Sequence, residues 1–270
     1  MKKEPLSLGE IRQIELQILR EIDRFCSSRG IRYSLAFGTL LGAIRHGGYI
    51  PWDDDIDIMM TRENYNKFRR EYSSKDYPFI DILTNNHHPV PLGKVYDAKT
   101  FFFYKGNIKR EYGVFVDVFP IDNMPDNIEV RRRWIKKVNR LIFLNGIKCN
   151  SWSVLLNSKH GVFTKVVRGC LKIFTNTNWI HRKLEALYTR YNNEDTKYMG
   201  AAMIFNNNKG LERVYPKQCF QNYRKIQFEN EEFCAIQDYH TFLTIRYDNY
   251  MELPPIEDRV YKHGIIAYYK

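Results

Sequence analysis

The chain has 270 residues, is 44% hydrophobic and 15% aromatic, and carries a formal charge of +11 at pH 7. This composition predicts a globular protein with a substantial core, and the sequence contains neither an internal repeat nor a low-complexity linker. The positive charge favours an anionic partner, which leaves nucleotide, phosphorylated glycan, membrane surface and nucleic acid open.

The cysteines and the hydropathy pattern bear on the compartment. Five cysteines, none in a C-x-x-C spacing, argue against a zinc site or a disulfide framework and favour a reducing cytoplasm. No segment reaches the ~20 uninterrupted apolar residues that a membrane-spanning helix requires. Charged residues interrupt the N-terminus, where a signal peptide would need an apolar core. We therefore expect a cytoplasmic protein and leave peripheral contact with the inner face of the membrane open.

The first predicted element is a helix that covers the core. Ser7 and Glu10 have the spacing of a capping box, in which the serine caps the helix and the glutamate reaches back. Isoleucines recur at helical spacing from Ile11 onward, and Gly30 ends the helix.

An anion site is predicted where the next strand ends. The apolar run 33–37 leads into Gly38 and Thr39, and a short helix over 40–45 follows. Such a turn places free backbone N–H groups at a helix N-terminus, where they can hold a phosphate.

The next strand carries two acids on one face. Successive strand side chains point to opposite faces, so Asp55 and Asp57 share one face and Ile56 and Ile58 the other. Two carboxylates side by side repel each other unless a cation lies between them, and Mg²⁺, with Mn²⁺ as an alternative, suits oxygen ligands. The alternative is an edge strand whose acidic face is solvated. Asp53, just before the strand, supports the site indirectly or caps a turn.

A phosphate cradle beside a carboxylate pair favours phosphoryl or nucleotidyl transfer. The whole stretch GTLLGAIRHGGYIPWDDDIDI, residues 38–58, resembles the signature of the LicD family, phosphotransferases with a nucleotidyltransferase-like core. The match is long and nearly uninterrupted.

A third acid follows in GVFVDVFPID, residues 113–122. Asp117 lies among apolar strand residues, where an acid is costly to bury without a cation or a hydrogen-bond partner. Sheet pairing would bring it to Asp55 and Asp57, although a lone acid in such a strand is more often a structural group. The string also resembles the second motif of the LicD family, which implies that Asp117 completes the metal site.

From about residue 127 the sequence becomes helical and basic. The segment 162–174 is amphipathic, with a broad apolar face opposite Lys165, Arg168 and Lys172. Such a helix can lie on an anionic membrane or cover a glycolipid acceptor, but an ordinary packed helix with a solvated basic face is the commoner case. No motif supports nucleic-acid binding.

The tail RYDNYMELPPIEDRVYKH, residues 246–263, resembles the C-terminal string of the LicD family. That string has Gly-Asp where this chain has Asp248 and Asn249, which leaves the local turn open. His263 either contacts substrate or satisfies a buried hydrogen bond.

The resemblance covers about residues 8–122 and 240–263 and implies a fold and a reaction. We expect an α+β protein in which 1–125 form a nucleotidyltransferase-like mixed β-sheet core flanked by helices. The basic, mainly helical region 126–270 would pack on that core and complete the donor and acceptor sites. The implied reaction moves a phospho-alcohol, such as phosphocholine, from a CDP-activated donor to a hydroxyl of a glycan or glycolipid acceptor and releases CMP. Teichoic acid, lipopolysaccharide and capsular polysaccharide precursors are the candidate acceptors.

As a working hypothesis, we assign roles to individual residues. Asp55, Asp57 and Asp117 would be the catalytic metal ligands, and Asp117 would also accept the proton of the attacking hydroxyl. The backbone of Gly38 and Thr39 would cradle phosphate. Arg45 or Lys94 would neutralise the charge of the leaving CMP. Two alternatives stay open: a nucleotidyltransferase that releases pyrophosphate, and an inactive scaffold of the same fold.

Overall fold

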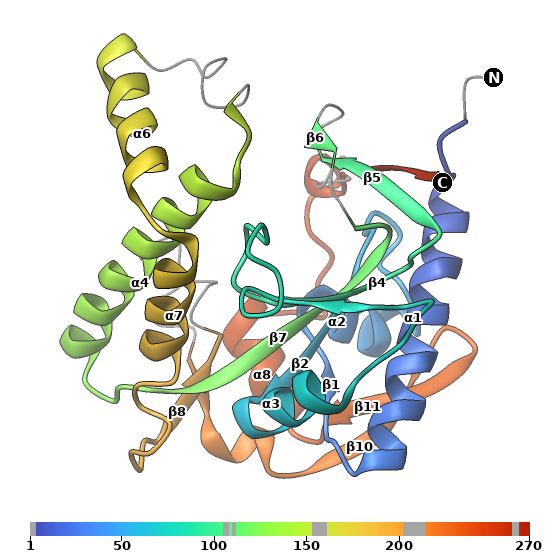
Figure 1. The fold of residues 1–270 in the computed structure, drawn as a ribbon. Helices are drawn as coiled ribbons and strands as arrows, with labels where there is room; N and C mark the ends of the chain where they lie inside the picture. Colours follow the sequence, from blue (N-terminus) through green and yellow to red (C-terminus); the bar gives the residue numbers. More distant parts are fainter. Residues whose placement is uncertain (1–3, 105–107, 110–111, 153–160, 202–213, 261–264) are drawn as a thin grey trace. The chain divides into compact units, whose positions relative to one another are not determined.

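The computed structural model describes residues 4–104, 108–109, 112–152, 161–201, 214–260 and 265–270. The chain forms two compact units (Figure 1). Unit 1 consists of Met1–Phe79, Lys94–Ile121 and Tyr215–Lys270, and unit 2 of Ile80–Gly93 and Asp122–Val214. Whether residues 1–125 fold as a domain by themselves stays a prediction.

Helix α1 (Leu8–Arg29) begins and ends as its sequence predicts. The Ser7 side chain accepts a hydrogen bond from the Glu10 backbone, and the Glu10 carboxylate accepts one from the Ser7 N–H at 2.7 Å, so the capping box is complete. Gly30 ends the helix with φ at +62°, a conformation that glycine adopts without steric cost. The isoleucine face is buried, with Ile18 and Ile22 fully covered.

A mixed sheet forms the centre of unit 1. Its strand order is β1-β2-β7-β4-β3, with β1 antiparallel to β2 and β2 parallel to β7. The strands are β1 (Ser34–Leu35), β2 (Ile56–Thr61), β3 (Phe79–Ile80), β4 (Gly93–Tyr96) and β7 (Phe115–Met124). The apolar residues of β2 and β7 are buried, as in strands covered on both faces. Helix α2 (Phe37–His46) precedes β2, and α3 (Arg62–Glu71) follows it.

Helix α2 begins earlier than its sequence predicts. It starts at Phe37 rather than at residue 40, and β1 is correspondingly short. Phe37 adopts a positive φ of 44°, which is unfavourable for a bulky residue. Its ring packs edge-on against Phe119 and near Phe242, with centroids 4.9 and 5.8 Å away. Tertiary packing therefore sets this helix start.

The C-terminal part of unit 1 contains strands as well as a helix. Strands β10 (Tyr223–Phe228) and β11 (Glu231–Ile236) form a hairpin, and α8 (Tyr239–Tyr247) follows it. Strand β12 (Ile265–Tyr269) pairs with β5 (Thr100–Tyr104), which also pairs with β6 (Ile108–Lys109). Two-residue β9 (Tyr215–Pro216) and the 3₁₀ helices η3 (Lys217–Phe220) and η4 (Ile256–Asp258) complete this part.

Unit 2 is mainly helical. Helices α4 (Ile128–Cys149), α6 (Val162–Phe174) and α7 (Thr177–Tyr188) make up most of it, and β8 (Tyr198–Gly200) pairs with the last residues of β7. Trp134, Val138, Ile180 and Leu184 form the centre of its core. Asn127 and Asn176 cap α4 and α7 through their side chains.

The α+β class with a mixed sheet is confirmed, with seven α-helices in the part of the chain that the structure describes. The likeness of the core to nucleotidyltransferases stays a prediction here. No helix within the described ranges is long and apolar enough to cross a membrane. All five cysteines are free thiols; Cys26 and Cys219 are buried, whereas Cys170 is exposed.

Candidate active site

Two predicted site residues, Asp57 and Asp117, lie opposite each other on adjacent strands. Strands β2 and β7 run parallel, and these two aspartates are direct partners in their register. Both side chains are half-buried, while Ile56 and Ile58 on the other face of β2 are fully buried. The alternation of acid and isoleucine therefore positions Asp57, and sheet pairing brings Asp117 beside it.

Thr39 connects the first turn of α2 to Asp57. Its hydroxyl oxygen accepts a hydrogen bond from the Asp57 backbone N–H at 2.8 Å. The Asp57 carbonyl accepts a second one from the Ala36 N–H at 2.9 Å. The Thr39 hydroxyl thus fixes the strand, while its backbone N–H belongs to the first helical turn, where no intrahelical acceptor is available.

The three aspartates before β2 lie close together. The carboxylates of Asp53, Asp54 and Asp55 offer oxygens that all lie within 4.8 Å of one another. The sequence argument gave Asp53 only a supporting role and none to Asp54. Gly38 adjoins this group, because a Cβ there would lie 2.6 Å from an Asp53 carboxylate oxygen. Asp53 therefore lies against the helix turn that was predicted to cradle phosphate.

Arg12, on α1, holds the loop 50–55 that carries the three aspartates. Its guanidinium donates hydrogen bonds to the backbone carbonyls of Ile50, Pro51 and Asp53, at 3.0, 3.1 and 2.6 Å. The guanidinium also lies over the Tyr49 ring, 4.6 Å from its centroid. Arg12 therefore positions the loop through its main chain.

The segment before that loop is held by the β10–β11 hairpin. The Glu229 carboxylate accepts a hydrogen bond from the Tyr49 N–H at 2.9 Å, and the Glu229 N–H donates to the Gly47 carbonyl at 2.7 Å. A Cβ at Gly48 would lie 2.2 Å from the same carboxylate, so a side chain here would displace the Glu229 carboxylate. The glycine pair that ends α2 thus allows close approach to the hairpin.

Two acids of this region, Asp57 and Glu15, have raised pKa values. Burial raises the pKa of Asp57, and the negative charges of Asp55, Asp117 and Asp53 raise it further, opposed by Lys94. Burial likewise raises the pKa of Glu15 on α1, and the charge of Asp55 adds to this effect. The site therefore holds more negative charge than its own cations offset. It suits a divalent cation with oxygen ligands.

Lys94 lies beside Asp117, and its predicted role toward the substrate stays a prediction. Its ammonium forms an ion pair with the Asp117 carboxylate, and the two side chains are 7% and 14% exposed. The ammonium also lies over the Phe115 ring, 3.4 Å from its centroid. Lys94 therefore offsets part of the carboxylate charge and anchors β4 to β7.

Arg45, another predicted site residue, contacts the segment after α8. Arg45 donates hydrogen bonds to the carbonyls of Tyr250 and Glu252, each at 2.9 Å. It therefore joins α2 to the segment after α8. His263 lies outside the described residues, as does its predicted contact with substrate.

Sequence reasoning missed two residues of α8. The charge of Asp57 contributes to raising the pKa of Tyr247, after burial as the main cause, and Arg246 opposes it. Arg246 lies over the Phe37 ring at 5.1 Å, and its buried Nε has no hydrogen-bond partner among the described residues. Both residues begin the C-terminal string singled out above, which was the available signal.

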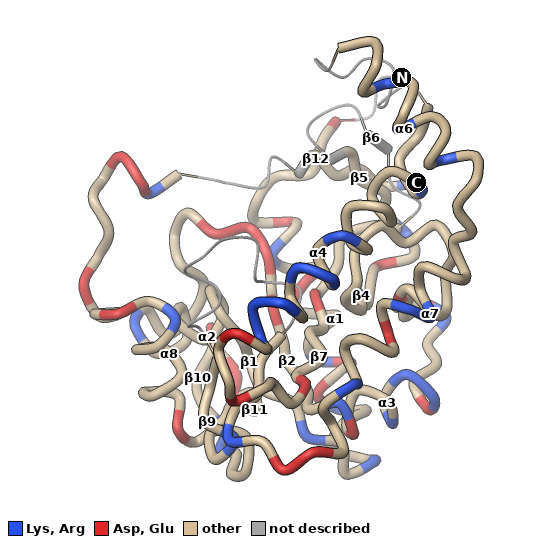
Figure 2. The backbone as a smooth tube through the Cα atoms, turned by 90° about the vertical axis from the view of Figure 1, so that its left-hand side faces the viewer, with Lys and Arg blue, Asp and Glu red and all other residues tan. Residues whose placement is uncertain are grey.

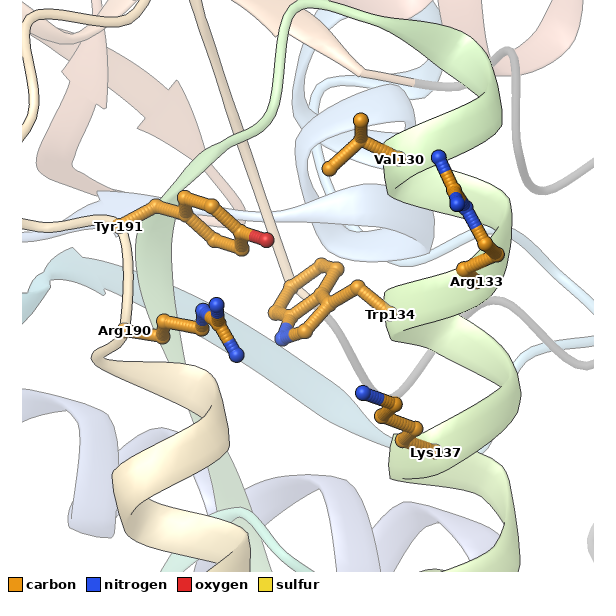
Figure 3. Close-up of a pocket in the computed structure, with 6 residues that line it drawn as sticks. All are labelled: Val130, Arg133, Trp134, Lys137, Arg190 and Tyr191. Carbon is orange, nitrogen blue, oxygen red and sulfur yellow. The ribbon is translucent and has the colours of Figure 1, made fainter.

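A separate pocket in unit 2 has different chemistry. It measures about 180 Å³, and Figure 3 shows its lining side chains, which come from α4 and from the turn after α7. They are Val130, Arg133, Trp134, Lys137, Arg190 and Tyr191. The three cations could attract an anion, but the lining contains neither a carboxylate nor a nucleophile. We therefore assign the candidate chemistry to the aspartates of unit 1.

Carboxylates gathered at the start of two parallel strands, beside a helix N-terminus, are typical of proteins that handle phosphates with a divalent cation. Residues 30–145 match the family described as LicD/FKTN/FKRP, nucleotidyltransferase domain. The chain is 31% identical over 275 residues to a Haemophilus influenzae protein named lipopolysaccharide cholinephosphotransferase LicD, covering 99% of both chains. The protein therefore belongs to the LicD family.

Shorter similarities agree with this assignment. An uncharacterised Rickettsia typhi protein is 39% identical over 111 residues, which are 41% of this chain and 35% of that protein. The human protein named ribitol 5-phosphate transferase FKRP is 49% identical over 53 residues, 18% of this chain and 11% of the human one.

Proposed function

We propose that this protein transfers a phospho-alcohol, with phosphocholine as the first candidate, from a CDP-activated donor to a hydroxyl of a lipopolysaccharide precursor. The observation that carries the proposal is the full-length similarity to the Haemophilus influenzae protein, whose name states cholinephosphotransferase activity on lipopolysaccharide. The human relative named for ribitol 5-phosphate keeps other alcohols open, and teichoic acid and capsular precursors are the other acceptors to test.

The proposed reaction is one displacement at phosphorus. The acceptor hydroxyl oxygen forms a bond to the phosphorus that carries the alcohol, and the bond from that phosphorus to the CMP phosphate oxygen breaks. CMP leaves with the electron pair, and the hydroxyl proton moves to a carboxylate, for which Asp117 is the candidate. Positioning and charge neutralisation supply most of the catalysis in such transfers.

The aspartates suit Mg²⁺, with Mn²⁺ as the alternative. Asp55 and Asp57 remain the proposed ligands together with Asp117, and the grouping of Asp53 and Asp54 with Asp55 adds two further candidates. A bound ion would offset the charge of the donor diphosphate. The raised pKa of Asp57 supports this proposal, because a cation would relieve the repulsion that causes part of the shift.

Neighbouring groups would position the donor. The first turn of α2 offers backbone N–H groups at Gly38 and Thr39 for a phosphate, in competition with the Asp53 carboxylate that lies against Gly38. Arg246 is a stronger candidate than Arg45 for meeting phosphate charge, because Arg45 is engaged with two backbone carbonyls.

The proposal is tested with purified full-length protein, CDP-choline and a lipopolysaccharide acceptor, with and without Mg²⁺. We expect CMP and a phosphocholine-modified glycan in equal amounts, only when acceptor and metal are both present. Asp57→Asn should abolish this activity, whereas Arg24→Gln, an exposed change on α1, should not affect it. Full activity of Asp57→Asn would contradict the metal assignment.

The family description names a nucleotidyltransferase domain, which favours nucleotidyl transfer as the second candidate. That reaction would consume CTP, attack its α-phosphorus and release pyrophosphate instead of CMP. A thermal-shift comparison of CDP-choline, CDP-ribitol, CDP-glycerol, CDP-ethanolamine and CTP, each with Mg²⁺, separates the two. A shift with none of them would favour the inactive scaffold.

A further inference from the structure

Helix α6 exposes its apolar face. Val162, Phe163 and Phe174 are 79%, 82% and 84% exposed, and none of the helix residues is buried. Val166 and Ile173, on the same face, are 58% and 61% exposed. An ordinary packed helix would bury these side chains. The interpretation of residues 162–174 as an ordinary packed helix with a solvated basic face is therefore wrong.

The basic face of α6 is the side that packs against α4. The Lys172 ammonium donates hydrogen bonds to the carbonyls of Lys148 and Asn150, at 2.7 and 2.6 Å, and the Lys148 ammonium donates to the Lys172 carbonyl at 2.7 Å. The Arg168 guanidinium lies over the Phe143 ring, 5.5 Å from its centroid. These bonds satisfy carbonyls at the ends of both helices. Turning the apolar face inward would break them.

Aromatic side chains from other segments of the same chain enlarge the exposed apolar surface. Phe143 on α4 is 53% exposed and Trp152 is 45% exposed. Trp152 belongs beside α6, because its ring lies 5.6 Å from the Lys172 ammonium and would touch a Cβ at Gly169. We call these two residues and the exposed face of α6 the α6 surface. An exposed apolar surface of this kind marks an interaction site.

The stretch of sequence that carries this surface has charge of one sign. Residues 130–184 contain 13 of the 42 lysines and arginines and none of the 31 acidic residues, so the rest of the chain holds 29 basic and 31 acidic residues. Basic positions recur along α4, α6 and α7 (Figure 2). The entire net positive charge thus belongs to the segment that carries the α6 surface.

We propose that the α6 surface binds an anionic lipid bilayer, with α6 lying along the interface and its phenylalanines in the boundary between headgroups and acyl chains. A 13-residue helix is too short to span a bilayer but has the length and amphipathicity of an interfacial helix. The acid-free segment complements anionic headgroups. A second copy of the chain is a poorer occupant, because two such segments would repel each other.

The test uses full-length protein and sedimentation with vesicles of phosphatidylcholine alone or with phosphatidylglycerol. We expect binding that requires phosphatidylglycerol and weakens with salt. Removing the two phenylalanines in Phe163→Ser/Phe174→Ser should weaken partitioning by at least about tenfold, because each buries a large apolar side chain in the bilayer. Both residues are exposed, so circular dichroism should be unchanged.

Ile256→Ser is the matched control, since Ile256 is 77% exposed but lies in unit 1. It should bind vesicles as the wild type does. Equal binding by the phenylalanine variant, or no binding of the wild type to anionic vesicles, would overturn the proposal. Dimerisation that the phenylalanine variant abolishes, without vesicle binding, would assign the surface to a second copy. The inference does not rest on the proposed transferase reaction.

Discussion

The hydroxyl of Thr39 accepts a hydrogen bond from the backbone N–H of Asp57, with 2.8 Å between the oxygen and the nitrogen. This bond joins the first turn of α2 to the strand that carries the candidate metal ligands. The helix that could hold phosphate and the carboxylate that could hold a cation are therefore fixed relative to each other.

Replacing Thr39 with valine should uncouple the helix turn from the strand. The change leaves the Asp57 N–H without its acceptor, which should cost about 1–3 kcal/mol of unfolding free energy. We also expect transfer activity to fall by at least about tenfold, because Asp57 is no longer held in place. Thr39→Ser keeps the hydroxyl and should behave nearly as the wild type in urea denaturation and in the transfer assay. Equal losses in both variants would show that the threonine methyl group matters instead.

Asp57→Asn should stabilise the metal-free protein. Burial and neighbouring acids raise the pKa of Asp57 above its ordinary value of 3.8. The folded protein therefore favours the protonated Asp57 carboxyl. The stability that this preference contributes is complete below about pH 3.8 and is lost as pH rises through the raised pKa. Asparagine does not ionise, so the melting temperature of the variant in EDTA should exceed that of the wild type increasingly from pH 4 to pH 8.

Mg²⁺ should reverse this ranking. A cation that binds only the folded state stabilises the wild type and, to a smaller extent, the variant that lacks one ligand. We expect Asp57→Asn to lose at least about 100-fold in transfer activity while gaining stability in EDTA. A variant that is less stable than the wild type in EDTA at pH 8 would contradict the electrostatic description of the site.

Lys94 and Asp117 should be coupled energetically. Lys94→Met removes the cation of a largely buried ion pair, which should cost about 3–5 kcal/mol in urea denaturation. Adding Asp117→Asn removes the carboxylate charge that Lys94 offset, and the double variant should recover much of the loss. Additive losses in this double-mutant cycle would show that the ion pair contributes nothing beyond its separate residues.

Asp248→Gly should stabilise the protein. Asp248 ends α8 with φ at +57° and ψ at −116°, a conformation that suits glycine, and its own side chain is exposed. Relief of the strain should add about 1 kcal/mol to the unfolding free energy. Asn249→Gly is the control, because Asn249 has no positive φ and should gain nothing.

Much of the local structure follows from the sequence. The capping box at Ser7, the left-handed Gly30 and the helix 162–174 are present as predicted, because each depends on neighbouring residues. The pairing of Asp57 with Asp117 could be expected as well, since each acid lies in an apolar sequence that is typical of a strand inside a sheet. Their roles as metal ligands stay predictions.

The features that depend on distant contacts could not be read from the sequence. Packing of Phe37 against Phe119 moves the start of α2, and the ion pair with Asp117 engages Lys94. The orientation of α6, with its apolar face exposed, could not be predicted from the sequence pattern either. Periodicity identifies the two faces of an amphipathic helix, but only the bonds of Lys172 to α4 decide which face turns inward.

The hydrogen bonds from Arg45 to the carbonyls of Tyr250 and Glu252 predict how truncations of the gene should behave. A nonsense codon after residue 214 would spare every aspartate of the candidate site and all of residues 30–145, which match the family. It would nevertheless remove Glu229 and the two carbonyls that hold the C-terminal end of α2 and the residues just after it. Late truncations should therefore act as null alleles rather than as partial ones.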